Sequence, residues 1–138
     1  MNPNCKVYGV QAAGAPSMQN ALKVGKTEAL ASVSTMADGI AVKQPGDLTF
    51  AMCQKYVDGV VTVTEDEIAS AILKLIEKHK MVAEGAGAVS VAAAMYNKVD
   101  IKGKKAVRVT SGGNVDVNVL DRIIDTACRL TAESQNCP

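Results

Sequence analysis

A serine that lies between a strand-like run and a pair of glycines is well suited to contact a ligand. The run is part of Lys104–Asn114, KKAVRVTSGGN, where Val107 and Val109 are typical of a strand buried on both faces of a parallel sheet. Ser111 and the two glycines follow at its carboxyl end, where ligands bind in open parallel sheets. Glycine lets a flat ligand approach the backbone, so the hydroxyl could contact it. Alternatively, Ser111 only caps a tight strand-to-helix turn.

A glutamate at the start of a small-residue segment is a second candidate for chemistry. The segment Glu84–Asn97, EGAGAVSVAAAMYN, predicts a buried helix that approaches its neighbours closely. A carboxylate at a helix N-terminus is stabilised by the helix dipole and the free amides. Glu84 could therefore act as a simple N-cap, or it could face a ligand site. The residues alone leave both readings open.

The elements that position these residues alternate between strands and helices. Strands are predicted over 6–11, 60–63 and 104–110. Predicted helices begin with caps at Ser17, Asp47, Thr64 and Asp116, and the small-residue helix begins at Glu84. The predicted fold class is α/β, with an open, mostly parallel sheet and flanking helices.

Composition narrows the class of protein further. The chain has 138 residues, 48% hydrophobic but only 3% aromatic, so the core must consist of Ala, Val, Ile, Leu and Met. The net charge is only +1 and the charged residues are scattered along the chain, which argues against nucleic acid or an anionic membrane as a partner. No apolar run approaches the ~20 residues of a membrane-spanning helix. The four cysteines are widely spaced, which favours reduced thiols in a cytoplasmic protein.

Several segments, taken in order, resemble one enzyme family. They are KVYGVQAAGAPSM, STMADGIAVKQPG, VVTVTEDEI, VAEGAGAVSVAAA and VTSGGN. Together they are similar to the carboxyl-terminal part of the catalytic domain of threonine ammonia-lyases (threonine dehydratases), which are fold-type-II pyridoxal-phosphate enzymes of the tryptophan-synthase-β type. The likeness runs from residue 2 to about 127. Serine dehydratases and serine racemases share the pattern.

The resemblance assigns a cofactor and site residues. It implies pyridoxal 5'-phosphate as the cofactor, with the Ser111 hydroxyl hydrogen-bonded to the pyridine nitrogen and Gly112 against the ring. It places Gly39 near the ring edge and Glu84 beside the cofactor as a catalytic residue. The implied reaction removes water and ammonia from threonine or serine, leaving 2-oxobutanoate or pyruvate. It also implies a cytoplasmic homo-oligomer of amino-acid metabolism, with isoleucine biosynthesis as one setting.

Two family segments have no counterpart here. The SFKxRG-like segment with the lysine that binds the cofactor covalently is missing, and so is the GGGGL-like phosphate loop. We therefore expect residues 1–130 to be the second half of the large catalytic domain, followed by a polar tail at 131–138, and the chain alone to be inactive. The alternatives are a related serine racemase or dehydratase, or a non-catalytic α/β ligand-binding fragment.

A metal site is not expected. Some relatives hold a divalent cation with acidic residues after the first strand, whereas this chain has Gln11, Ala12, Ala13 and Ser17 there. Mg²⁺ and Ca²⁺ prefer carboxylate ligands.

Overall fold

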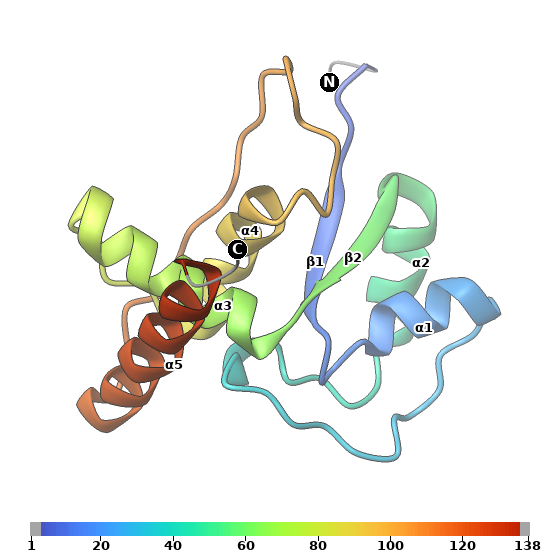
Figure 1. Ribbon diagram of the computed structural model, residues 1–138. Helices are drawn as coiled ribbons and strands as arrows, with labels where there is room; N and C mark the ends of the chain where they lie inside the picture. The colour runs from blue at the N-terminus through green and yellow to red at the C-terminus, as the bar shows by residue number, and fades with distance from the viewer. Residues whose placement is uncertain (1–3, 136–138) are drawn as a thin grey trace.

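Two parallel strands lie at the centre of the computed structural model, which describes residues 4–135 (Figure 1). Strand β1 (Tyr8–Ala12) pairs with β2 (Gly59–Val63) in a parallel register that runs from Tyr8 opposite Gly59 to Ala12 opposite Val63. In Figure 1, α1 and α2 lie on one side of the strands, and α3, α4 and α5 lie on the other. The predicted α/β class with parallel strands and flanking helices is confirmed.

The crossover from β1 to β2 carries α1 (Ser17–Val24), a short 3-10 turn (Asp38–Ile40) and α2 (Asp47–Tyr56). Helix α1 ends where expected, at Gly25, whose left-handed φ of 84° suits glycine.

The predicted caps at Ser17 and Asp47 are wrong, because each is the first helical residue and follows Pro16 or Gly46. Ser17 is buried, and its hydroxyl accepts from the Gln11 side-chain amide at 3.5 Å. The Asp47 carboxylate instead accepts from the Thr27 hydroxyl at 3.3 Å.

Helix α3 (Glu65–Lys74) begins with the predicted capping box and continues as a π-helical turn, Leu75–His79. The Glu67 amide donates to the Thr64 hydroxyl at 3.2 Å, and the Thr64 amide donates to the Glu67 carboxylate at 2.8 Å. These reciprocal bonds satisfy two amides that a helix start would leave free.

Helices α4 (Gly85–Met95) and α5 (Val117–Gln135) complete the fold. The predicted cap at Asp116 is confirmed, because its carboxylate accepts from the Asn118 amide at 2.8 Å. Helix α5 continues through residue 135, beyond the expected start of a polar tail at 131. Residues 136–138 of that predicted tail lie outside the described residues.

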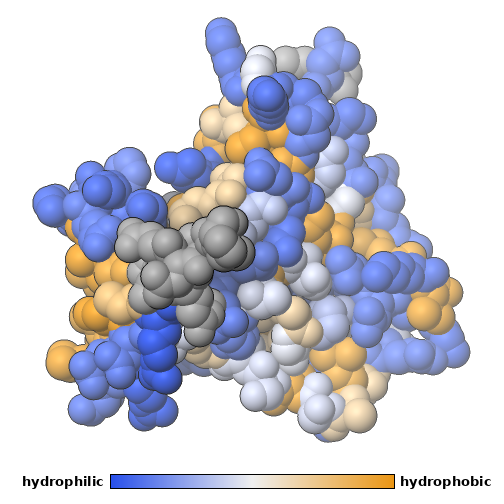
Figure 2. Space-filling model, in the orientation of Figure 1, coloured by the Kyte–Doolittle hydropathy of each residue, from blue (hydrophilic) through white to orange (hydrophobic). Residues whose placement is uncertain are grey.

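Small apolar side chains fill the core between the sheet and α3, α4 and α5. Helix α4 packs against both strands and α3, and α3 packs against α5. Ile68, Ile72 and Val63 are among the largest fully buried side chains, and no aromatic side chain is fully buried in the described part of the chain. Apolar residues also reach the surface among the charged ones (Figure 2). Within residues 4–135, no helix has the length and apolarity needed to cross a bilayer.

The predicted third strand is wrong. Residues 104–110 follow α4 as an irregular segment outside the sheet, and Val107 and Val109 are 97% and 76% exposed. A β-branched pattern favours an extended chain, but a strand also needs a neighbour for its backbone groups. Neither β1 nor β2 pairs with this segment, and the Val109 carbonyl instead accepts from the Ser90 hydroxyl at 2.6 Å.

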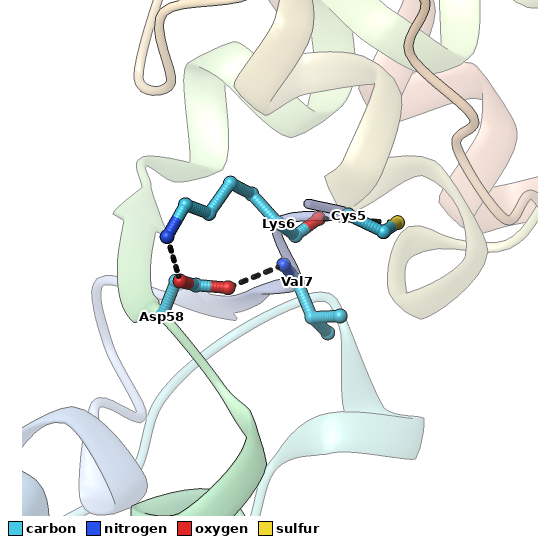
Figure 3. Close-up of polar contacts among 4 residues, drawn as sticks. All are labelled: Cys5, Lys6, Val7 and Asp58. Carbon is cyan, nitrogen blue, oxygen red and sulfur yellow. Dashed lines mark hydrogen bonds and ion pairs between the residues drawn. The ribbon is translucent and has the colours of Figure 1, made fainter. Parts of the chain in front are cut away.

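One aspartate joins the starts of the two strands (Figure 3). The Asp58 carboxylate accepts from the Val7 amide at 2.7 Å and from the Lys6 ammonium at 2.8 Å. The Asp58 amide donates back to the Val7 carbonyl at 2.8 Å. The Lys6 hydrogen bond, followed by that of the Val7 amide, holds the pKa of Asp58 below its ordinary value. These hydrogen bonds extend the pairing of β1 with β2 by one residue pair, Val7 and Asp58.

Acid should therefore weaken the strand pairing through Asp58. Since its pKa is lowered by folding, the stabilisation is fully present above the ordinary value of 3.8 and is lost as the pH falls through the folded pKa. We expect Asp58→Asn to flatten the decline of the urea midpoint between about pH 5 and pH 2. Asp121→Asn, at an exposed site on α5, is the matched control and should keep the full decline.

Candidate functional site

The start of α4 brings together three of the four site residues predicted from the sequence. Glu84 immediately precedes the helix, and its carboxylate lies between Gly39 and Gly112. A Cβ added at Gly39 would be 3.6 Å from Glu84 Oε1, and one added at Gly112 would overlap the carboxylate. Gly112 also has a φ of 72°, a conformation that glycine adopts readily. Glycine is therefore needed at position 112 for the approach of Glu84, whereas at position 39 the tight neighbour would be Ala86 Cβ, at 3.1 Å.

The fourth predicted residue, Ser111, lies against the same helix through its backbone. The Glu84 amide donates to the Gly112 carbonyl at 3.1 Å, which fixes residues 111 and 112 beside the helix start. A Cβ added at Gly87 would overlap the Ser111 carbonyl. Ser111, Gly112 and Gly39 are all exposed, and Glu84 is half-buried. The cluster therefore faces solvent and is accessible to a ligand.

Glu84 occupies the N-cap position without acting as a side-chain cap. No side-chain hydrogen bond to the first turn of α4 is formed, whereas the Glu84 carbonyl accepts from Gly87 and Ala88. Its carboxylate is thus left beside the two glycines. This geometry favours the site-facing reading over the simple cap.

The close approach of Gly87 to the segment that carries Ser111 was not predicted from the sequence. The alternation of glycine and alanine in EGAGA did predict a helix that neighbours can approach closely. It did not indicate that the segment approaching at Gly87 would be the one that carries Ser111. The pattern of one glycine every second residue was the available signal.

Other features of the surface lie away from this cluster. A depression of about 430 Å³ is lined by residues of α1, α2 and the start of β2, and none of the four predicted site residues lines it. Among residues 4–135, no three His, Cys, Asp or Glu side chains are grouped in a way that could hold a metal ion. The cluster around Glu84 remains the candidate site because it brings together residues from three separate segments that the sequence had singled out.

Comparison with known proteins points to one family. The family model described as "Pyridoxal-phosphate dependent enzyme" matches residues 1–112. An L-threonine ammonia-lyase of Thermotoga maritima is 59% identical over 125 residues, which are 91% of this chain and 31% of the relative. The chain therefore spans about a third of that relative's length.

Solved structures agree with this likeness. The processed form of threonine deaminase isoform 2 from Solanum lycopersicum superposes with a TM-score of 0.85 at 35% identity, covering 94% of this chain and 36% of that one. A serine racemase from Dictyostelium discoideum superposes with a TM-score of 0.74 at 36% identity, covering 84% of this chain and 37% of that one.

Proposed function

Because this chain belongs to the family of pyridoxal-phosphate dependent enzymes, we propose that it forms part of a threonine ammonia-lyase, which converts threonine to 2-oxobutanoate and ammonia. The observation that carries the proposal is the meeting of Glu84, Gly39 and Gly112, with Ser111 adjacent, in a chain 59% identical to a relative of that name. Residues 1–130 would contribute the second half of the large domain of a cytoplasmic homo-oligomer.

The residues present fit one end of the cofactor. Gly39 and Gly112 keep the backbone on either side of the Glu84 carboxylate free of side chains, which suits a flat ring held against backbone. Ser111 offers a neutral hydroxyl for the ring nitrogen, and Glu84 offers a carboxylate beside it. The phosphate end has no counterpart, because the sequence contains no four-glycine run.

Each of these residues would then have a distinct role. When bound, pyridoxal phosphate supplies an electron sink for the bond-breaking steps. A neutral hydroxyl at the ring nitrogen keeps that sink weak, which suffices when the β-hydroxyl leaves soon after the α-proton. The Glu84 carboxylate would accept or hold a proton near the reacting atoms, and the glycines would let the ring lie flat.

A chimera tests the proposal. The 125 matched residues of the Thermotoga maritima relative would be replaced by the corresponding residues of this chain. We expect the chimera to form 2-oxobutanoate and ammonia from threonine. The chain of 138 residues alone is the control and should form neither, because it lacks an SFKxRG-like lysine. A folded, cofactor-bound chimera with no lyase activity would contradict the proposal.

Serine racemisation is the second candidate function. The likeness to the Dictyostelium discoideum serine racemase favours it. In the same chimera, conversion of L-serine to D-serine without release of ammonia would support this candidate over the lyase.

Substitution of Ser111 should lower the turnover rate but should not release the bound cofactor. In the chimera, Ser111→Ala removes one hydrogen bond, worth roughly 0.5–1.5 kcal/mol, so turnover should fall by about 2- to 10-fold while the cofactor stays bound. Ser111→Asp should have a larger effect, because a carboxylate would favour a protonated ring nitrogen. Steady-state rates and visible absorbance are the measurements, and wild-type rates for both variants would exclude this role.

Glu84 should act on turnover more than on stability. Its side chain makes no capping bond, so Glu84→Gln should leave the melting temperature nearly unchanged. The same substitution should lower kcat in the chimera and alter its pH profile. A loss on the order of 1 kcal/mol in stability with an unaltered pH profile would instead identify a cap.

A further inference from the structure

A second glutamate, Glu65, is hydrogen-bonded to the loop that carries Gly39. It is the first residue of α3, and its Oε2 accepts from the Met36 amide at 2.7 Å. The neighbouring Thr64 and Glu67 already form the capping box of that helix. Glu65 is therefore free to bond a segment 29 positions earlier in the chain.

The other carboxylate oxygen of Glu65 has no hydrogen bond in the described part of the chain to offset the cost of its burial. Oε1 is buried and has no hydrogen-bond partner among the residues that the structure describes. Buried polar atoms are nearly always paired, and an unpaired carboxylate oxygen is costly. A carboxylate in this setting is an unusual choice for packing alone, which points to its bond with the Met36 amide as the reason for the residue.

The loop that Glu65 holds leads directly to the candidate site. The Met36 carbonyl and the Ala37 backbone pack against Gly85 at the start of α4, where an added Cβ would lie 2.9 Å from Met36 O. Ala37 is fully buried, and its carbonyl accepts from the Ile40 amide at 3.0 Å. The turn closed by this bond contains Gly39, beside the Glu84 carboxylate.

We propose that Glu65 is a positioning residue that holds the loop of residues 36–40, and thereby Gly39, at the distance from Glu84 that the site requires. This inference rests on the proposed function for its catalytic consequence, although its structural part stands without it. A hydrogen bond to a charged acceptor is shorter and stronger than a neutral one, which suits an anchor for a loop. Glu65 itself would touch neither substrate nor cofactor.

Amide exchange of the 138-residue chain, followed by NMR, tests the structural part. In Glu65→Ala, the Met36 amide should exchange about 10-fold faster or more, and the Ile40 amide should follow, because the loop loses its anchor. The Ile68 amide, which donates to the Thr64 carbonyl in the first turn of α3, should keep its rate. Glu65→Gln retains an acceptor and should restore most of the protection.

Asp66→Ala is the matched control, since it removes an exposed acid from the same turn of α3 and should leave all three rates unchanged. Unchanged Met36 and Ile40 rates in Glu65→Ala would overturn the inference. Equal acceleration of loop and helix amides in both Glu65 variants would also overturn it, because Glu65 would then serve the fold alone.

The catalytic part is tested in the chimera with threonine. Glu65→Ala should lower kcat about 10-fold and change KM by less than about two-fold. The substitution would displace Gly39 at the edge of the cofactor ring without removing a contact to the substrate. Glu65→Gln should recover most of kcat. Normal kcat for Glu65→Ala in an active chimera would overturn the positioning role. An inactive parent chimera would count against the proposed function. The amide-exchange rates would still show whether Glu65 holds the loop of residues 36–40.

Discussion

Gly87→Ala is expected to lower threonine turnover of the chimera by about 100-fold, more than Ser111→Ala, because it would displace Gly112 and disturb Glu84 as well as Ser111, and misplacing groups at a site by about 1 Å can cost that much. The added Cβ would overlap the Ser111 carbonyl, so the segment that carries Ser111 and Gly112 must move away from α4. The shift would stretch the hydrogen bond from the Glu84 amide to the Gly112 carbonyl.

Stability should respond much less to this substitution. Alanine favours a helix interior by about 1 kcal/mol over glycine, which opposes the cost of the clash. The displaced segment is also exposed and can shift without opening the core. Gly59→Ala is the matched control, since its Cβ would meet the Tyr8 ring at an ordinary 3.5 Å. Normal kcat/KM in Gly87→Ala would show that Ser111 does not need this position.

Ile72→Ala is expected to have the largest effect on stability. Ile72 is fully buried in α3, the helix that packs against both α4 and α5. Truncating such a side chain removes buried apolar surface and leaves a cavity, which costs about 2–5 kcal/mol. Urea unfolding should show a lower midpoint with an unchanged slope. Because single domains are stable by only about 5–15 kcal/mol, the loss would be a large fraction of the total.

A partly exposed isoleucine provides the comparison. Ile124 on α5 is 37% exposed, so Ile124→Ala leaves a site that solvent and neighbours can fill. Its cost should be clearly smaller than that of Ile72→Ala. Equal midpoints for the two variants would mean that α3 is not the centre of the core.

Local signals predicted much of the fold. The Thr64–Glu67 capping box, the Asp116 cap and the end of α1 at Gly25 depend on residues within one helical turn, and all three are present. The strand predicted over 104–110 failed because strand formation depends on a distant partner that no local pattern encodes. Ser17 failed as a cap for a similar reason, since burial beside Gln11 decided its role.

The site was predicted less by pattern than by resemblance. Glycine turns and a helix-start glutamate each had an ordinary structural explanation, so spacing alone could not have joined Gly39 to Glu84. Glu65 gave no signal, because an acid in the first turn of a helix is usual on electrostatic grounds. Its bond to Met36 appears only once the fold brings the two segments together.

The exposed segment at residues 104–110 has a consequence for the behaviour of the protein in concentrated solution. An exposed run outside the sheet with outward valines is a template on which another molecule could add a strand, as in aggregation. Here Lys105 and Arg108 accompany Val107 and Val109, while Lys104 is paired with the Asp100 carboxylate at 2.7 Å. Stacking two copies in register would bring like charges together, so these cations act as gatekeepers against self-assembly. Salt screens that repulsion, so the protection is greatest at low ionic strength.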